Sequence, residues 1–494
     1  MRIATKVVLV LLAALLLVEA GFSLLWPIAH DEAPLFYEAF LMRDEGRVPY
    51  RDIFDFQMPG SYAAYYTLGV FGGFDDFPIR ILDLLLLTTL MVVTFSFMRR
   101  FGWMPALVAS LLFGLKYLDS GPSMSLQREY LLLIFISVAI WIALQNELTP
   151  WRRVWMGFFF GLAATIKPHA VIGLIPLLLF DIANMVRSDS MTPLKATRKS
   201  VLPVLGGFLV PVIGAVAWVG FTGALNPFID IVRNYWPLYA HINGKMEVNF
   251  GARRWLFILD QLWQLGGNRW WLLSAGVGVY FALRQEQFRK HVYLLVSLTI
   301  CYAFYPAFSG QFFPYHWLPF VYFIILLSAL CLVEVKWQTG LVLLLVMLLS
   351  VRMPGAIFRQ IEGKPIATAS SRANQIALYL RKHLEQSDTV QPLDWTGGTL
   401  LAMLETRAHI ATPFVFDFYF YHHVSNPYIQ NLRAKFINDL QVSSPRFIVE
   451  VTSIDKPWIS GEDTSHEFPE LRAFLAENYS ITIQKDDYVI YERH

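Results

Sequence analysis

Residues 26–46 read WPIAHDEAPLFYEAFLMRDEG and begin where the first apolar segment of the chain ends. An acidic pair, Asp31 and Glu32, therefore lies where a hydrophobic helix would meet water. Asp31 followed closely by Pro34 is typical of a helix start, where a carboxylate caps free N–H groups. A carboxylate at the same place would also suit a general base. The pattern leaves both roles open.

The segment before this pair, residues 6–27, begins with Lys6 after Arg2, and these two basic residues ahead of an apolar stretch resemble a secretion signal. It runs for about 20 residues and lacks a clear small-x-small cleavage site, which favours a retained membrane helix.

The whole chain of 494 residues is 55% hydrophobic and only 16% charged. Soluble proteins carry roughly a quarter charged residues, so this composition indicates a membrane protein. Apolar runs long enough to span a bilayer recur along the first 351 residues. We expect about eleven spans, at 6–27, 79–98, 102–118, 129–145, 154–167, 169–186, 201–221, 270–284, 292–309, 317–333 and 338–351.

Lys and Arg collect in every second connection, which predicts a cytoplasmic N-terminus and an extracytoplasmic C-terminus. Two long loops, 28–78 and 222–269, then lie outside and carry many aromatic side chains, as expected at the headgroup level. Within the first loop, the pattern predicts amphipathic helices at 33–43 and 61–71.

Residues 352–494 alternate between helical and strand patterns and end in a predicted hairpin, 480–493. The sequence thus predicts a transmembrane domain, 1–351, followed by an extracytoplasmic α/β domain, 352–494. Cys301 and Cys331 lie in apolar runs and provide no disulfide framework.

The first loop continues as GRVPYRDIFDFQMPGSYAAYY (46–66), with Arg51, Asp52 and Gln57 close together. The planar guanidinium of Arg51 suits a phosphate. The alternative is a solvated loop with local salt bridges.

The second outer turn, KYLDSGPSMSLQRE (116–129), offers Asp119, Arg128 and Glu129. Asp is common in tight turns, so Asp119 is equally explained as a turn residue. A charged residue at the entrance of a membrane helix costs little free energy, so Arg128 and Glu129 also fit an ordinary helix start. On the second predicted span, Arg80 and Asp83 are three residues apart, which predicts an internal ion pair.

Polar residues also interrupt two apolar stretches. Lys167 and His169 occur in ATIKPHAVIGL, and Tyr315 and His316 in QFFPYHWLPF. Ionisable residues so placed usually face a polar cavity, where Lys167 would hold a phosphate. The alternatives are that Lys167 anchors its helix at the membrane interface and that His316 is a hydrogen-bonded packing residue. His30, His169 and His316 would ligate a metal only if the fold gathers them. Their spacing forms no metal motif, and any requirement for a divalent cation stays open.

Several signatures are absent from the chain. No Walker-type loop, dinucleotide fingerprint, H-E-x-x-H or G-x-S-x-G motif occurs, which argues against ATP-driven transport and serine hydrolase chemistry. A net charge of +2 does not favour nucleic acid as a partner.

Taken together, the acidic pair after the first span, GRVPYRDIFDFQMPGSY, LQREYLLLIF, IKPHAVIGLIPLLL and FPYHWLPF resemble bacterial polyprenyl-phosphate-dependent glycosyltransferases. These enzymes form part of the glycosyltransferase C superfamily, with the protein O-mannosyltransferases and the lipid A aminoarabinose transferases. The terminal ENYSITIQKDDYVIYERH is similar to the end of an extracytoplasmic domain in bacterial members. The resemblance covers essentially the whole chain.

This resemblance implies a sugar transferase of the bacterial cytoplasmic membrane, using a polyprenyl-phosphate-sugar donor and a lipid or glycan acceptor, with inversion. It implies Asp31 as the base with Glu32 beside it, and a second acid that is either Asp119 or Glu129. A phosphate leaving group needs no proton but does need positive charge, which Arg51, Arg128 or Lys167 would supply.

Two other functions compete. A lipid or glycan transporter would explain the spans but not the long outer loops, and paired inverted repeats are not evident. An O-antigen polymerase or ligase would use Arg and His of a large outer loop, which RNYWPLYAHINGKMEVNFGARRW (233–255) contains.

Overall fold

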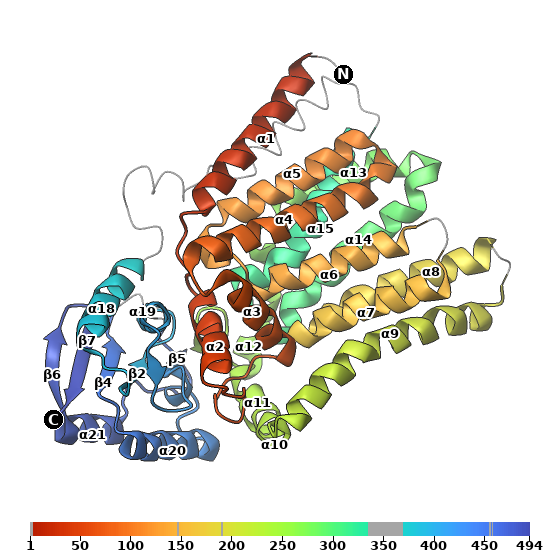
Figure 1. Ribbon diagram of the computed structural model, residues 1–494. Coiled ribbons are helices and arrows are strands. Elements are labelled where there is room, and N and C mark those ends of the chain that lie inside the picture. The colour runs from red at the N-terminus through yellow and green to blue at the C-terminus, as the bar shows by residue number, and fades with distance from the viewer. Residues whose placement is uncertain (1–2, 146–147, 189–190, 334–368, 454–455, 457) are drawn as a thin grey trace.

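The protein is built as a bundle of long helices with a smaller helix-and-sheet region at one end (Figure 1). The structure, a computed structural model, describes residues 3–145, 148–188, 191–333, 369–453, 456 and 458–494. The bundle helices are α1 (Ile3–Ser23), α4 (Asp76–Met98), α5 (Trp103–Asp119), α6 (Arg128–Ala143), α7 (Pro150–Ile166), α8 (Leu174–Ser188), α9 (Pro193–Phe221), α13 (Trp270–Leu283), α14 (Arg289–Ser309) and α15 (Leu318–Ala329).

Each bundle helix overlaps one predicted span, whereas the predicted span 338–351 lies outside the described residues. Six described stretches are long and apolar enough to cross a membrane: Lys6–Ser23, Asp76–Phe101, Pro168–Arg187, Pro193–Phe221, Glu286–Ser309 and Pro314–Leu332. Helices α5, α6, α7 and α13 are shorter than these. The chain is a mainly helical, multi-pass membrane protein.

Helices α7 and α9 cross with their backbones in close contact. A Cβ atom added at Gly157 of α7 would collide with the carbonyl oxygen of Val204, and one at Gly207 of α9 with that of Val154. Such small-residue crossings are typical of helix packing in membranes, where close backbone approach maximises van der Waals contact. The contact fixes the first half of α7 against α9.

The first outer loop contains the two predicted helices, α2 (Glu32–Asp44) and α3 (Pro59–Gly72). Residues 32–41 of α2 are all buried, so this part of the loop does not present its aromatic side chains to lipid. Helix α2 packs against α3 and against α19 (Thr399–Thr406) from the C-terminal region. The apolar side chains that indicated a lipid contact are covered by protein.

The second outer loop forms α10 (Leu225–Asp230), α11 (Trp236–Tyr239) and α12 (Gly251–Gln264). Helix α12 leaves Trp255, Leu256, Leu259 and Trp263 exposed on one side. An amphipathic helix with this pattern is typical of a segment lying in the membrane interface, so the predicted surface character fits α12.

The C-terminal region consists of helices and a five-stranded sheet in the order β3-β2-β4-β7-β6. The pairs β2–β3 and β2–β4 are parallel, whereas β4–β7 and β6–β7 are antiparallel. The central strand, FIVEV, is fully buried. The elements besides α19 are α18 (Ser370–His383), α20 (Pro427–Ser443), α21 (Pro469–Asn478), β2 (Thr389–Leu393), β3 (His409–Ile410), β4 (Phe447–Val451), β6 (Tyr479–Gln484) and β7 (Tyr488–Arg493).

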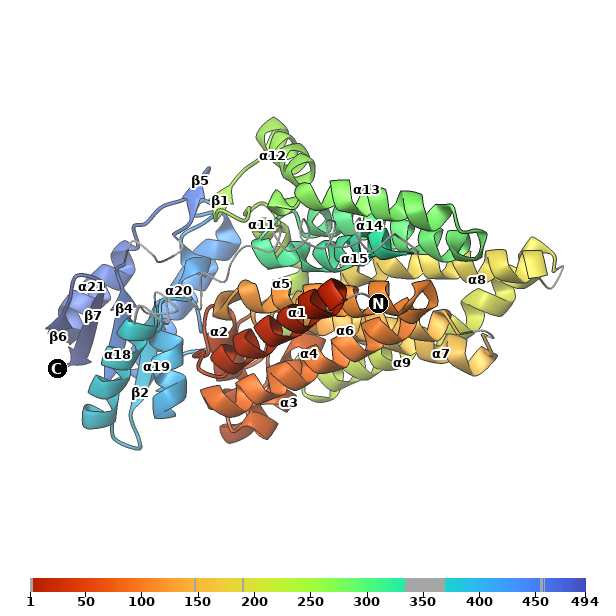
Figure 2. The same cartoon turned by 90° about the horizontal axis from the view of Figure 1, so that it is seen from above.

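The C-terminal region lies beside α2 (Figure 2), and hydrogen bonds attach it to both outer loops. Tyr37 donates to the carbonyl of Ala408 at 2.7 Å, and Arg47 to that of Ile410 at 2.8 Å. Strand β1 (Glu247–Val248) of the second outer loop pairs with β5 (Ser460–Gly461). The C-terminal region therefore covers the end of the bundle that carries Asp31.

Candidate active site

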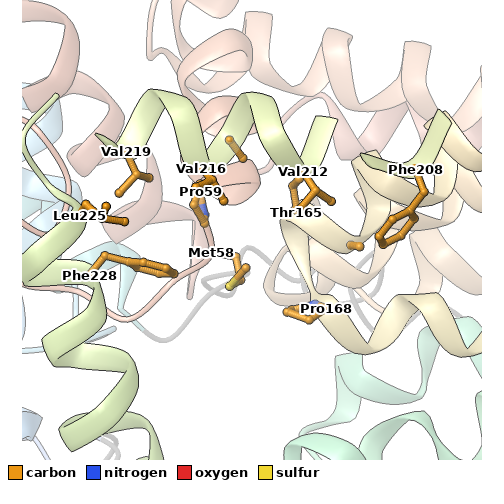
Figure 3. A pocket seen from close by; sticks show the side chains of 12 residues that line it. Met58, Pro59, Thr165, Pro168, Phe208, Val212, Val216, Val219, Leu225 and Phe228 are labelled. Atoms are coloured by element: carbon orange, nitrogen blue, oxygen red, sulfur yellow. The ribbon is translucent and has the colours of Figure 1, made fainter. Parts of the chain in front are cut away.

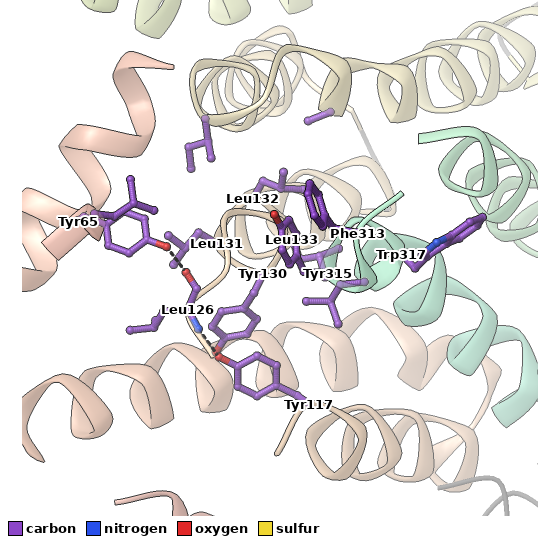
Figure 4. Packing of buried hydrophobic residues seen from close by; sticks show 14 of the residues in the cluster. Tyr65, Tyr117, Leu126, Tyr130, Leu131, Leu132, Leu133, Phe313, Tyr315 and Trp317 are labelled. Carbon is purple, nitrogen blue, oxygen red and sulfur yellow. Dashed lines mark hydrogen bonds between the residues drawn. The ribbon is translucent and has the colours of Figure 1, made fainter. Parts of the chain in front are cut away.

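The turn before α6 is held by two tyrosine hydroxyls (Figure 4). Tyr65 of α3 donates to the carbonyl of Leu126 at 2.6 Å, and the Leu126 N–H donates to the Tyr117 hydroxyl at 2.9 Å. Leu126 has a φ of 47°, which a non-glycine residue adopts only when its surroundings impose it. The turn therefore places Arg128 and Glu129, at the start of α6, with little freedom.

Asp31 stands at the N-cap position of α2 but makes no capping hydrogen bond. Its Oδ2 accepts from Nη2 of Arg128 at 2.9 Å. Nη1 of Arg128 donates to the side-chain oxygen of Gln57, and its guanidinium lies over the Tyr315 ring at 5.8 Å. The acid at the mouth of the first span is thus directed at α6 instead of at its own helix.

The carboxylate of Asp31 is buried and remains charged. Its Oδ1 lies 3.0 Å from Nδ1 of His30 but accepts no aligned hydrogen bond. Burial alone would raise the pKa of Asp31, but the charges of His30 and Arg128 outweigh it and hold the pKa below the usual range. A charged oxygen with a free lone pair remains.

The neighbouring acid, Glu32, is fully engaged in a structural ion pair. Its two oxygens accept from Nη1 and Nη2 of Arg80 at 2.7 and 2.6 Å, and Oε2 also accepts from the Ala29 N–H at 3.1 Å. The predicted pairing of Arg80 with Asp83 is wrong, because Ser125 stands between them, accepting from Arg80 at 2.7 Å and donating to Asp83 at 2.6 Å. Glu32 therefore fixes the loop that carries Asp31.

A second cluster begins at Glu129. Lys167 lies 3.2 Å from Oε1 of Glu129, and Nε2 of His316 lies 3.5 Å from the same oxygen. The Tyr305 hydroxyl donates to that oxygen at 3.4 Å, and the ring of His169 packs on Tyr305 at 4.3 Å. Because Pro168 ends α7, Lys167 turns into the protein in an extended conformation.

Four buried polar atoms in these two clusters have no hydrogen-bond partner among the described residues. They are Oδ1 of Asp31, Nε of Arg128, Oε2 of Glu129 and Nε2 of His169. Buried polar groups are nearly always paired, so a concentration of unpaired ones indicates a place prepared for a polar ligand.

An apolar cavity of about 230 Å³ includes in its wall the chain neighbours of two residues of these clusters (Figure 3). Met58 at its wall directly follows Gln57, and Pro168 directly follows Lys167. The lining residues are Met58, Pro59, Ala164, Thr165, Pro168, Phe208, Val212, Ala215, Val216, Val219, Leu225 and Phe228. A polar cluster thus adjoins an apolar chamber between α7, α9 and α10.

Three predicted site residues make other contacts. Arg51 pairs with Asp52 at 2.7 Å and donates to the Thr222 carbonyl at 2.9 Å, which matches the salt-bridge alternative. Asp119 forms an ion pair with Lys116, 3.6 Å away on the same helix.

The histidines do not combine into one ligand set. Across the described ranges, no three His, Cys, Asp or Glu side chains come together as metal ligands. His169 and His316 lie in the Glu129 cluster, whereas His30 contacts Asp31.

The segment 233–255, considered above for a polymerase or ligase, includes Arg254. Its guanidinium donates to the carbonyl of Ala240 at 2.6 Å, a contact within the same loop.

Sequence reasoning missed a pair of buried acids, Glu38 and Asp55, close to this site. Asp55 accepts from Tyr62 at 3.0 Å and from Tyr419 of the C-terminal region at 3.3 Å. Burial raises the pKa of Asp55 to about 6, and burial together with Asp55 raises the pKa of Glu38 well above its ordinary range. Asp55 was visible in the sequence, but its partner lies 17 residues earlier on a helix expected at the surface.

This pair predicts a pH dependence of stability. Because the pKa of Asp55 is higher folded than unfolded, its stabilising contribution is complete below about pH 4 and is lost as the pH rises through about 6. We expect Asp55→Asn to flatten the fall in melting temperature between pH 4.5 and 7, measured in detergent. Asp44→Asn, at an exposed carboxylate, should leave the change of melting temperature with pH as in the wild type. The same change with pH in both variants would contradict the raised pKa of Asp55.

Comparisons with known proteins concern the sequence and the fold of the chain. A family model described as dolichyl-phosphate-mannose-protein mannosyltransferase matches residues 60–218. No curated protein gives a significant sequence match.

The fold as a whole is shared with a solved enzyme structure. ArnT from Cupriavidus metallidurans in the apo state superposes with a TM-score of 0.62 and 14% identity, covering 99% of this chain and 98% of that one. The same protein bound to undecaprenyl phosphate gives 0.61 and 14% over the same shares. The predicted resemblance to the glycosyltransferase C superfamily is confirmed, and the family match together with the shared fold indicates a membrane glycosyltransferase.

Proposed function

We propose that the protein transfers a sugar from a polyprenyl-phosphate donor to a lipid or glycan acceptor of the cell envelope. The observation that carries this proposal is the buried network of Asp31, Arg128, Glu129 and Lys167, with unpaired polar atoms, beside an apolar cavity. A donor with a charged phosphate and a hydrocarbon tail matches both halves of this site. The ArnT structure that shares the fold is bound to undecaprenyl phosphate, which supports the class of donor.

In the proposed reaction, Asp31 accepts the proton of the acceptor hydroxyl as its oxygen attacks the anomeric carbon. The new bond joins this oxygen to the carbon, and the bond from the carbon to the phosphate oxygen breaks on the opposite face, with inversion. The leaving polyprenyl phosphate is an anion and needs no general acid, unlike the leaving group of a glycosidase. Arg128 and Lys167 supply the positive charge that stabilises it.

Arg128 links donor binding to the strength of the base. Without donor, its guanidinium pairs with Asp31 at 2.9 Å and contributes to the low pKa of that carboxylate. A donor phosphate would compete for the same guanidinium, because Nε of Arg128 has no partner among the described atoms. Losing part of this pairing raises the basicity of Asp31 when the substrate is present.

We further propose that the reaction takes place at the extracytoplasmic face of a bacterial cytoplasmic membrane. Basic connections lie at the opposite ends of the helices, which supports this orientation. Residues 352–494 would then form an extracytoplasmic domain that covers the site.

A transfer assay tests the function. Purified protein in lipid vesicles receives a panel of radiolabelled undecaprenyl-phosphate sugars with an extract of envelope lipids and glycans. We expect one donor to label one acceptor. Movement of the lipid without transfer would instead identify a transporter, and growth of a polymer would identify a polymerase or ligase.

Lys167 provides a second test. We expect Lys167→Gln to lower kcat/KM by about 10²–10³-fold, the usual effect of removing one preorganised electrostatic contact to a developing charge. The exposed outer-loop substitution Lys245→Gln removes the same charge and should have little effect. Thermal unfolding of both variants checks that they fold. A folded Lys167→Gln protein within threefold of the wild-type kcat/KM would exclude Lys167 from phosphate binding.

A further inference from the structure

A second cavity, of about 460 Å³, lies at the other end of the bundle from Asp31. The ends of α4 and α6 and the last turns of α8 form one part of its wall, and the starts of α7, α9 and α14 form the rest. This end of the bundle is far from the C-terminal region (Figure 1). Its wall includes the charged and polar side chains of Arg100, Arg153, Asp181, Lys199, Lys290 and His291.

The described residues of the cavity wall carry more positive than negative charges. The one described acid in its wall, Asp181, is paired with Arg153 through two hydrogen bonds of 2.7 and 2.9 Å. Within the described residues, no carboxylate lies in ion-pair distance of Arg100, Lys199 or Lys290. Among the described residues, these three cations therefore face a space with no acidic partner for them.

Arg100 is held in place before any ligand arrives. Its guanidinium donates to the carbonyls of Phe97 and Leu144 at 2.8 and 2.6 Å and lies 3.1 Å from Nε2 of His291. A half-buried, fixed guanidinium is well suited to phosphate, because little side-chain entropy remains to be lost. The two lysines lie at the exposed rim and add point charges.

Exposed tryptophans place this cavity at the level of lipid headgroups. Trp103 begins α5, Trp141 lies near the end of α6, and Trp151 and Trp155 lie in the first turns of α7, all with exposed rings. Tryptophans gather at membrane–water interfaces. Apolar walls at Leu148 and Phe180 offer contact for the first carbons of an acyl chain.

We propose that this cavity binds the phosphate of an anionic membrane phospholipid, in the leaflet opposite the candidate active site. The basic connections mark this end as cytoplasmic, and the cytoplasmic leaflet carries anionic lipids that bind basic pockets between helices. The same phosphate chemistry would suit a soluble anion, but the ring of tryptophans and the apolar walls favour a lipid.

Native mass spectrometry of the full-length protein in detergent tests this proposal, with phosphatidylglycerol, phosphatidylcholine and inorganic pyrophosphate titrated separately. We expect one phosphatidylglycerol to bind at least about tenfold more tightly than phosphatidylcholine. The variant Lys199→Gln/Lys290→Gln should weaken that step by about 10-fold, and adding Arg100→Gln by up to about 100-fold.

The matched control is Arg99→Gln/Lys195→Gln/Arg198→Gln, which removes three exposed cations from the same face but outside the cavity. The proposal is supported if this control keeps the wild-type affinity while the cavity variants lose it. It is overturned if control and cavity variants weaken binding equally, or if pyrophosphate binds as tightly as phosphatidylglycerol and displaces it. The double lysine variant keeps the contacts of Arg100. It therefore still tests the proposal if the triple variant does not fold.

Discussion

Replacing Asp31 with Asn is expected to lower the rate of sugar transfer by about 10²–10⁴-fold, the usual contribution of a positioned general base. The amide keeps the size of the side chain but cannot accept the proton of the acceptor. Because Asp31 makes no capping bond to α2, the substitution should not unravel that helix. The measurement is kcat at saturating donor and acceptor, with protein purified in lipid.

Two controls make this result specific. Asp44→Asn removes a carboxylate of the same loop that pairs with Arg43 near the surface, and it should transfer at the wild-type rate. Donor binding should survive in Asp31→Asn, because Arg128 and Lys167 remain. A folded Asp31→Asn protein with full transfer would remove Asp31 as the base and direct attention to Glu129, whose Oε2 is also buried and unpaired.

Removing Arg80 is expected to have the largest effect on stability. Arg80→Met leaves Glu32 buried without its partner, and breaking a buried ion pair in this way costs about 3–5 kcal/mol. The loop that carries Asp31 should loosen with it, since Arg80 also donates to the carbonyls of Trp26 and Pro27. The check is denaturant or thermal unfolding of the variant in detergent.

A second substitution separates the charge effect from lost packing. In Arg80→Met/Glu32→Leu the buried carboxylate of Glu32 is removed together with its partner, so the double variant should recover much of the stability that the single one loses. Arg99→Gln, exposed and directly after the end of the helix that carries Arg80, should unfold like wild type. An Arg80→Met protein as stable as wild type would show that the Glu32 pair is not what holds the loop.

The bundle could be predicted from sequence because an apolar run of membrane length has few other uses in a folded chain. The helices of the first outer loop were also predictable from periodicity. Their burial was not, because part of the cover of α2 comes from α19, which begins at Thr399, and periodicity does not identify a distant partner.

The candidate site shows the same limit more sharply. Asp31, Glu129 and Lys167 were recognisable as charged residues at the ends of apolar segments. Their pairing was not, since Asp31 and Arg128 are 97 residues apart in the chain. The predicted pair of Arg80 with Asp83 considered only spacing on one helix, whereas a buried guanidinium takes whichever carboxylate the fold presents.

The identity of the released lipid tests the central claim most directly. Wild-type protein is incubated with the one polyprenyl-phosphate sugar that supports transfer, and the lipid product is measured by mass spectrometry alongside the labelled acceptor. The proposed reaction breaks the bond between sugar and phosphate, so one polyprenyl phosphate should appear for each sugar transferred. Unchanged donor, with lipid only moved across the membrane, or activity restricted to diphosphate-linked glycans with release of polyprenyl diphosphate, would contradict it.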